Sequence, residues 1–207
     1  MNGLEIELAF ADLNQRQIIP SSHRQTFRGV CSWNQLPASV ASCQKATAFI
    51  INTADSNQIE GEHWIGFFSP NPEALPEIFD SYGLGPAFWI RDKESFYAKL
   101  CTYYYCCLHH PPIYNTCQLQ SVSSNLCGQY CISYLVYRLL GRSFSEFLDD
   151  FNLASCCAND MHVLSFVNRT LRLHSFTEPS AKLRLNDYCS SRIQSCRSLF
   201  DTLLCTC

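Results

Sequence analysis

The stretch that most constrains the fold runs from Gln120 to Leu140 and reads QSVSSNLCGQYCISYLVYRLL. It opens with polar, turn-forming residues and has no glycine or proline after Gly128, which predicts a helix with Ser or Asn as its N-cap. Apolar residues then recur at helical spacing, at positions 131, 132, 135, 136, 139 and 140, so the helix should be buried. Cys127 is therefore expected at or near the N-terminus of a buried helix.

That position would change the chemistry of the Cys127 thiol. Unpaired backbone N–H groups and the helix dipole favour negative charge there, so the thiol should ionise more readily than a free one. Gly128, the next residue, leaves room for another backbone to pass close to the sulfur. The alternative is that Cys127 is an ordinary buried cysteine, which is the commoner case for a cysteine taken without context. Residues elsewhere in the chain distinguish the two.

Length, composition and charge narrow the class of protein. With 207 residues, 47% of them apolar and 13% aromatic, we expect a single domain over residues 1–207 that ends in a helical segment at 182–207. A net charge of −3 gives no basis for binding nucleic acid or an anionic membrane. Residues 1–10 lack a signal-peptide pattern, and no stretch is apolar enough to span a bilayer. The fourteen cysteines then predict reduced thiols inside the cell, in the cytoplasm or nucleus.

Three segments predict an antiparallel meander. They are apolar runs at 46–53, 62–69 and 75–82, separated by polar turns. If the second turn is centred near residues 71–72, His63 lies directly opposite Asp80, with the Cβ atoms about 5 Å apart. A carboxylate at that distance can orient an imidazole and stabilise its protonated form. A slip of one residue would put the two side chains on opposite faces, and His63 would then be an ordinary half-buried histidine.

The other segments are predicted more coarsely. Residues 3–14 fit either a helix or a strand, residues 26–37 an ordered surface loop, and residues 88–100 an amphipathic helix. A strand should begin near 111–115 and lead into 118–121. Further helices are expected at 143–151, at 159–173 and near the C-terminus, with the following candidate caps: Gly141 after the Cys127 helix, then Ser143 or Ser145, Asn159 or Asp160, and Asn186 or Asp187.

Four residues in sequence order carry candidate chemistry: His63, Asp80, Gln120 and Cys127. A cysteine nucleophile needs a base, a group that orients the base, and a donor for the developing oxyanion. His63, Asp80 and Gln120 are of the right types for these three roles. The Gln120 amide and the Cys127 backbone N–H could form an oxyanion hole, although a glutamine taken alone is more often a surface residue.

In this order and spacing, the residues resemble those of adenovirus-type cysteine proteases, in the clan that also holds the SUMO proteases. The resemblance rests on four motifs, with support from Asn52-Thr53 and from the segment FRGVCSWNQLP. It covers residues 26–168 and is greatest for the versions encoded by Maverick or Polinton virus-like DNA transposons. The motifs are His63-Trp64, the run FDSYG at 79–83, Gln120, and the run CGQYC that begins at Cys127, seven residues after Gln120.

The resemblance implies an α+β fold of the papain-related kind, in which a central, antiparallel-rich mixed sheet packs against the buried cysteine helix and further helices lie outside. It implies Cys127 as nucleophile, His63 as base, Asp80 as orienting acid and Gln120 as oxyanion donor. No cofactor or metal is implied. Two further residues are expected to contact substrate: Trp64, as a wall beside the imidazole, and Gly128.

The chain also departs from that family. Adenovirus enzymes usually carry Glu at the position of Asp80, although the shorter acid is normal in the wider clan. Their basic surface and the cysteine that binds their cofactor peptide have no clear match in this sequence. DNA- or peptide-assisted activation is therefore not carried over.

The implied activity is that of a cysteine endopeptidase acting through a thioester acyl-enzyme on protein substrates. These would be viral or transposon capsid precursors cleaved at glycine-containing sites, and the enzyme could be packaged in virus-like particles. One alternative is an isopeptidase that removes ubiquitin-like modifiers with the same four residues. Another is a zinc-binding interaction protein, although paired Cys-x2–4-Cys knuckles are missing; its candidate ligands are Cys101, Cys106, Cys107, His109, His110 and Cys117.

Overall fold

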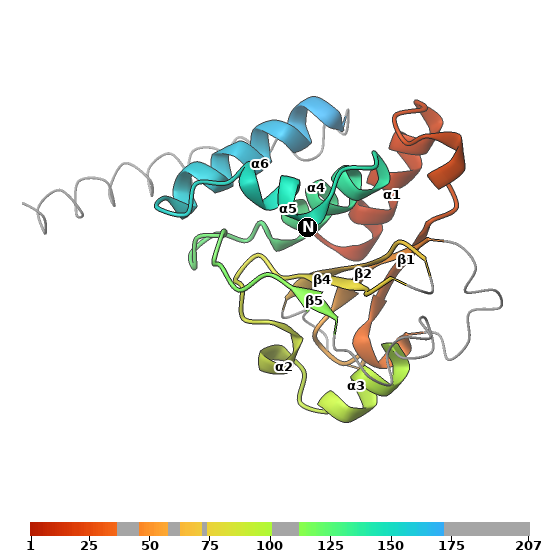
Figure 1. Ribbon diagram of the computed structural model, residues 1–207, viewed down its shortest axis with the longest axis vertical. Coiled ribbons are helices and arrows are strands. Elements are labelled where there is room, and N and C mark those ends of the chain that lie inside the picture. The colour runs from red at the N-terminus through yellow and green to blue at the C-terminus, as the bar shows by residue number, and fades with distance from the viewer. Residues whose placement is uncertain (37–45, 58–62, 72–73, 101–111, 172–207) are drawn as a thin grey trace, which may run out of the picture. The chain divides into compact units, whose positions relative to one another are not determined.

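The computed structural model describes residues 1–36, 46–57, 63–71, 74–100 and 112–171 (Figure 1), and all structural statements concern these residues. They belong to one compact unit, Met1–Leu171. The C-terminal helical segment predicted at 182–207 lies outside the described residues. Within them, no helix is long and apolar enough to cross a membrane.

Helices and strands occur together in this unit, which confirms the predicted α+β class. Two single-turn 3-10 helices (Ser21–His23 and Trp33–Gln35) accompany them. The remaining elements are α1 (Gly3–Gln15), β1 (Phe27–Ser32), β2 (Thr47–Asn52), β3 (Trp64–Ser69), β4 (Glu77–Phe79), α2 (Pro86–Trp89), α3 (Lys93–Leu100), β5 (Ile113–Tyr114), α4 (Cys127–Leu139), α5 (Phe144–Asp149) and α6 (Cys156–Thr170).

The five strands form one mixed sheet in the order β1-β2-β3-β4-β5. The pairs β2-β3 and β3-β4 are antiparallel, which confirms the predicted meander. β1 pairs in parallel with β2, and β5 pairs in parallel with β4. The interpretation of residues 26–37 as a surface loop was therefore wrong over β1. Its register shifts after Phe27, and Gly29 adopts a φ of +125°, so the strand has no regular alternation to reveal it.

The register of β3 against β4 differs from the predicted one by two residues. Gly66 pairs with Phe79, so a continued ladder would put residue 63 opposite residue 82 rather than opposite Asp80. The turn between the strands is centred one residue later than expected. Because the difference is an even number of residues, His63 and Asp80 still belong to the same face of the sheet.

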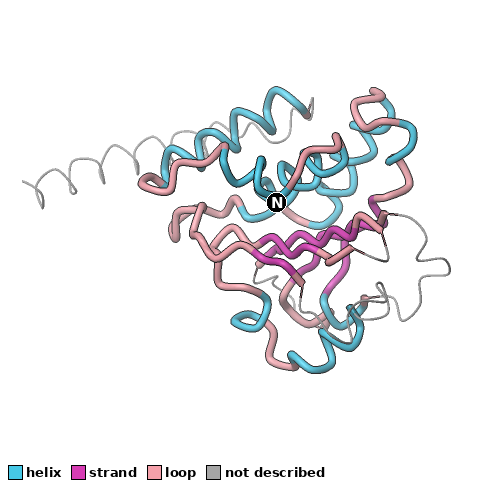
Figure 2. The backbone as a smooth tube through the Cα atoms, viewed as in Figure 1, coloured by secondary structure: helices cyan, strands magenta, loops and turns pink. Residues whose placement is uncertain are grey.

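Both faces of the sheet are covered by helices. The helices α1, α4, α5 and α6 lie on one side of the strands, and α2 and α3 lie on the other (Figures 1 and 2). α4 packs against β3, where Gly66 makes a close approach possible: a Cβ at this position would lie 2.8 Å from the Tyr134 ring. On the other side, Phe49 and Ile51 of β2 share a core with Phe96 of α3. Burial on both faces explains why every residue of β2 is buried.

The helix ends differ from the predictions in two places. α4 begins at Cys127 with Leu126 as N-cap, and no side chain caps it, so the predicted Ser or Asn cap was wrong. α6 begins at Cys156 and is capped by Ser155, because Asn159 and Asp160 are buried and bonded elsewhere. The Ser143 cap of α5 is confirmed, as a capping box with Glu146.

Two further segments refine the predictions. Residues 3–14, for which helix and strand were both open, form α1, which starts in a capping box of Asn2 and Glu5. The single amphipathic helix predicted at 88–100 is two helices, α2 and α3, with a break between them.

Cys157 is disulfide-bonded, so the expectation of reduced thiols is wrong at this residue.

Candidate active site

Three of the predicted chemical residues meet at one end of the sheet. His63 immediately precedes β3, Asp80 immediately follows β4, and Cys127 is the first residue of α4. His63 Nε2 lies 2.8 Å from Asp80 Oδ1, and the Cys127 thiol is close enough to the His63 ring that each group shifts the pKa of the other. Because Nε2 is taken by Asp80, Nδ1 is the ring nitrogen available to the thiol. The result is a line of three interacting groups, Asp80–His63–Cys127, in which the carboxylate is hydrogen-bonded to the imidazole.

The Asp80 carboxylate is fully buried and accepts four hydrogen bonds. Oδ1 accepts from His63 and from the backbone N–H of Tyr82 at 2.9 Å. Oδ2 accepts from the indole N–H of Trp89 at 2.9 Å and from the backbone N–H of Leu84 at 3.1 Å. These donors and the His63 charge outweigh the opposing effect of burial and lower the pKa of Asp80. The carboxylate therefore stays ionised and held in one orientation.

The backbone around Asp80 is fixed by residues that the sequence did not single out. The Asn115 side chain accepts from the Asp80 N–H at 2.9 Å and donates to the Asp80 carbonyl at 2.6 Å. The Asn115 amide thereby satisfies both backbone polar groups of Asp80, as the backbone of a neighbouring strand would. Gly83 closes the turn with a φ of +68°, and a Cβ there would come within 2.5 Å of the Cys117 carbonyl oxygen. Only glycine fits this turn without movement of the backbone.

The pKa values of His63 and Cys127 shift in opposite directions. Burial disfavours the imidazolium, but the hydrogen bonds and charges of Asp80 and Cys127 outweigh it and raise the pKa of His63 to about 9. Burial likewise disfavours the thiolate, but His63 and the backbone N–H groups of Trp64 and Gly128 outweigh it and lower the pKa of Cys127. Together these shifts favour a thiolate–imidazolium pair near neutral pH.

Gln120 is fully buried, so it is not the surface residue that a lone glutamine usually is. Its Oε1 accepts from the Ser81 hydroxyl at 2.6 Å, and its Nε2 donates to the Ser124 carbonyl at 2.7 Å and to the Tyr82 hydroxyl at 3.2 Å. A carbonyl can only accept, so the contact with Ser124 fixes which end of the amide carries the nitrogen. The Tyr82 ring in turn lies against His63. The amide N–H group is thus held near the reactive residues, and its part in catalysis stays a prediction.

The two expected substrate-contact residues lie beside the N-terminal residue of the chain. The Trp64 indole N–H donates to the Met1 carbonyl at 3.2 Å, and a Cβ on Gly128 would lie 3.2 Å from the Met1 sulfur. The rings that contact the imidazole belong to Trp89 and Tyr82, with centroids 4.5 and 5.0 Å away. Trp89 and Tyr82 therefore flank the imidazole, and substrate contact by Trp64 and Gly128 stays a prediction.

A buried pair on α6 holds the segment that leads into α4. The Asp160 carboxylate accepts from the Tyr130 hydroxyl at 2.9 Å and from the Ser121 N–H at 3.4 Å, and Asn159 Nδ2 donates to the Leu119 carbonyl at 3.2 Å. Burial outweighs these hydrogen bonds and raises the pKa of Asp160 to about 6. The sequence suggested these two residues only as helix caps. Their observed role positions the backbone on both sides of Gln120.

The zinc alternative concerns residues that are mostly outside the described parts of the chain. Within those parts, no group of three or more His, Cys, Asp or Glu side chains could hold a metal ion. Cys117 is a half-buried free thiol. The other candidate ligands lie outside the described residues: Cys101, Cys106, Cys107, His109 and His110.

Comparison with known proteins gives only distant similarities. No protein-family model matches the sequence, and no curated protein sequence matches it. A crystal structure of the ASFV pS273R protease is similar over 66% of this chain and 59% of that one, with 17% identity and a TM-score of 0.38. A selenomethionine crystal structure of the same protease matches 50% of this chain and 38% of that one, with 24% identity and a TM-score of 0.32.

In both comparisons this chain spans less than two thirds of the ASFV protease, about three-fifths of it in the first and two-fifths in the second. TM-scores this low give the similarity no weight for function. A function for this chain therefore has to be inferred from the geometry of the site.

Proposed function

We propose that the chain is a cysteine protease in which Cys127 is the nucleophile. One observation carries this proposal: the buried line Asp80–His63–Cys127, in which the pKa of the imidazole is raised to about 9 and that of the thiol is lowered. A structural cysteine gains nothing from a charged imidazole whose partner carboxylate accepts four hydrogen bonds. A nucleophile that must be a thiolate at neutral pH requires this arrangement.

The proposed reaction uses these groups in the following order. The Cys127 thiolate attacks the carbonyl carbon of a peptide bond, and the carbonyl electrons move to the oxygen, which becomes an oxyanion. The Cys127 backbone N–H and one Gln120 N–H, which would exchange its longer bond to the Tyr82 hydroxyl, would donate to that oxyanion. As the tetrahedral intermediate collapses, the C–N bond breaks and His63 gives its proton to the departing amine. The product is a thioester between Cys127 and the first half of the substrate.

Hydrolysis returns the enzyme to its starting state. His63, now neutral, removes a proton from water as the water attacks the thioester carbonyl. Collapse of the second tetrahedral intermediate releases the carboxylic acid and the Cys127 thiolate. Asp80 keeps the imidazole in one orientation and stabilises its charge in both steps. Trp89, which bonds to Asp80 and packs on His63, shields this ion pair from water and so strengthens it.

The substrate is proposed from the sequence resemblance. The endopeptidase would cleave capsid precursor proteins of a virus or a virus-like DNA transposon next to glycine, inside the cell and with packaging into virus-like particles. Glycine beside the scissile bond is what the resemblance implies, and the absence of a side chain at Gly128 leaves the Met1 side chain closest to that position. The isopeptidase alternative needs the same catalytic residues, so only the choice of substrate separates the two.

The test is incubation of the purified chain with capsid precursors from the same genetic element and, in parallel, with a protein conjugated to a ubiquitin-like modifier. New N-termini in the precursors, found by mass spectrometry, are expected with the wild type and not with Cys127→Ala. A matched control is Cys31→Ala, because burial raises the pKa of Cys31 to about 12 and this thiol takes no part in the proposed reaction. Cleavage that survives Cys127→Ala, or no cleavage of either substrate class, would contradict the proposal.

A further inference from the structure

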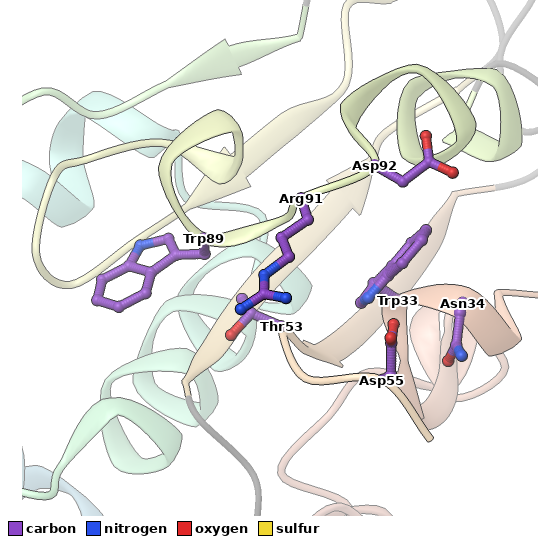
Figure 3. A pocket seen from close by; sticks show the side chains of 7 residues that line it. All are labelled: Trp33, Asn34, Thr53, Asp55, Trp89, Arg91 and Asp92. Atoms are coloured by element: carbon purple, nitrogen blue, oxygen red, sulfur yellow. The ribbon is translucent and has the colours of Figure 1, made fainter. Parts of the chain in front are cut away.

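A cavity of about 350 Å³ opens beside the candidate base. Two of its lining residues contact His63 directly. The Trp89 ring centroid lies 4.5 Å from that of the imidazole, and the Thr53 N–H donates to the His63 carbonyl at 2.9 Å. Trp33 and Arg91 also line the cavity, and Figure 3 shows all of these lining side chains. None of the predicted site residues lines the cavity, and it lies one residue away from His63, on the far side of Trp89 and Thr53.

The chemistry of amide cleavage relates this place to one half of the substrate. When the acyl-enzyme forms, the base must hand its proton to the departing amine nitrogen. The chain that follows the scissile bond therefore starts in contact with His63. Because Trp89 and Thr53 join His63 to the cavity, the first side chains of this departing segment can reach it.

The charge within the cavity indicates which side chain would bind there. Arg91 extends its guanidinium group toward Thr53, between Trp89 and Trp33 (Figure 3). It takes part in none of the ion pairs found among the described residues. The two acidic lining residues already have interactions: Asp92 caps α3 by accepting from the Ser95 N–H at 3.0 Å, and Asp55 is also engaged. Both carboxylates keep their charge, and the guanidinium is the positive group among the lining residues, with no ion pair to either of them in the described parts of the chain.

We propose that this cavity is a specificity subsite for the segment released after the scissile bond, and that Arg91 there binds an acidic side chain. The inference rests on the proposed protease function and deepens it by naming a substrate feature. A guanidinium presents several N–H donors in a plane that matches a carboxylate, and the Trp33 ring offers an apolar wall for the stem of a Glu or Asp side chain.

The experiment uses the full chain and a mixture of denatured proteins of known sequence, with new N-termini identified by mass spectrometry. For cuts that depend on Cys127, wild type should enrich Asp and Glu within the first few residues after the scissile bond. Arg91→Glu should change the ratio of acidic to basic residues there by about tenfold, as expected when one partly exposed charge contact is reversed. Residues before the scissile bond should stay the same in both proteins.

Lys93→Glu supplies the matched control, because Lys93 is an exposed residue of the same segment that does not line the cavity. It makes the same charge change and should leave the preference as in wild type. An unchanged preference in Arg91→Glu, an equal change in Lys93→Glu, or a wild-type preference for basic residues would overturn the subsite. Absence of any cleavage that depends on Cys127 would instead overturn the protease function itself, and the subsite with it.

Discussion

The His63 imidazole and the Asp80 carboxylate are 2.8 Å apart although they are not cross-strand partners. His63 lies just before β3 and Asp80 just after β4, and a continued ladder would leave them offset by two residues. The sheet brings them to the same end of the strands and the same face, and the turn after Asp80 makes the final alignment. The geometry of the candidate site therefore depends on Asn115 and Gly83, which hold that turn.

Gly83→Ala should damage both stability and activity. The φ of +68° disfavours any residue with a Cβ, by about 1 kcal/mol, and a Cβ would also lie 2.5 Å from the Cys117 carbonyl oxygen. The backbone must then move at the turn that carries Asp80, so we expect a loss in the upper part of the range for point mutations, about 3 kcal/mol or more. Urea unfolding and peptidase activity measure the two effects.

Gly141→Ala is the control for backbone strain alone. Gly141 has a similar φ of +83°, but nothing lies within 4 Å of a Cβ built there. We expect it to lose only about 1 kcal/mol and to keep its activity. Equal losses for the two variants would show that the close approach to Cys117 is unimportant.

The pH dependence of thiol alkylation should single out Cys127. Its pKa is lowered, whereas burial raises the pKa values of Cys31, Cys131 and Cys156. Iodoacetamide at mildly acidic pH should therefore label Cys127 well before these three thiols, and mass mapping of the labelled peptides shows the order. Even labelling, or labelling that begins at another cysteine, would contradict the thiolate–imidazolium pair.

Asp80→Asn tests the origin of the His63 shift. Peptidase activity needs the imidazolium, so it should fall as pH rises through about 9, the pKa of His63. Removing the Asp80 charge should lower that pKa, and the alkaline limb of the kcat/KM profile should move to lower pH. The Cys127 labelling midpoint should move to higher pH, because the thiolate loses part of its counter-charge. His63→Ala should cost more activity than Asp80→Asn, since the carboxylate transfers no proton.

The sequence patterns predicted those parts of the fold that depend on residues close together in the chain, namely strands joined by short turns and the buried face of a helix. The apolar runs and polar turns of the meander gave β2, β3 and β4 because strand pairing across a short turn depends on residues close in sequence. The helical period from Cys131 to Leu139 gave the buried face of α4 for the same reason. Cys127 came out at the first turn of that helix although its N-cap, Leu126, carries no capping side chain.

Features that depend on distant residues could not be predicted in this way. β1 is an edge strand whose Phe27 stacks on Phe10 of α1, with ring centroids 3.8 Å apart. No local pattern around either residue predicts that the two rings meet. Asn115 substitutes for a strand at Asp80, which requires that two segments 35 residues apart meet. Trp89 bonds to Asp80 and packs on His63 only because the fold brings the three residues together. No sequence motif around Trp89 indicates this role.

Asp160→Asn should remove a pH dependence of stability. The pKa of Asp160 is raised to about 6 from its usual 3.8, so the folded state holds this proton more tightly than the unfolded state. The contribution to stability is present at low pH and is lost as pH rises from about 4 to about 6. A shift of about two units corresponds to about 1–3 kcal/mol. In the variant, an amide oxygen can still accept from Tyr130 and Ser121, and urea midpoints should vary less over this range.

Asp12→Asn is a suitable control, because that carboxylate forms a partly buried ion pair with Arg16 one helical turn away and lies outside the candidate site. Such pairs contribute little, so the variant should keep the wild-type change in stability between pH 4 and 6. If Asp160→Asn shows the same change as wild type, the Asp160 carboxylate titrates near its ordinary pKa and burial does not raise it.

The last prediction concerns Gln120. If its amide donates to the oxyanion, that bond forms mainly in the transition state, and Gln120→Ala should lower kcat by roughly 10²–10³ with a smaller change in KM, equivalent to about 3–4 kcal/mol. Gln120→Glu should be at least as harmful, because a carboxylate would repel the oxyanion and would face the Ser124 carbonyl, now 2.7 Å from Nε2. Iodoacetamide labelling of Cys127 should hardly change in either variant.

Gln120 is buried, so the loss of its hydrogen bonds could also act through stability, and Ser81→Ala separates the two effects. This variant removes the 2.6 Å bond to Oε1 and leaves the Nε2 donor in place. It should lower the free energy of unfolding by about 1–3 kcal/mol but reduce kcat far less than Gln120→Ala. If the two variants lower kcat equally, Gln120 only supports the fold. If folded Gln120→Ala keeps a near-normal kcat, it has no part in the reaction, because no transition-state donor would then have been lost.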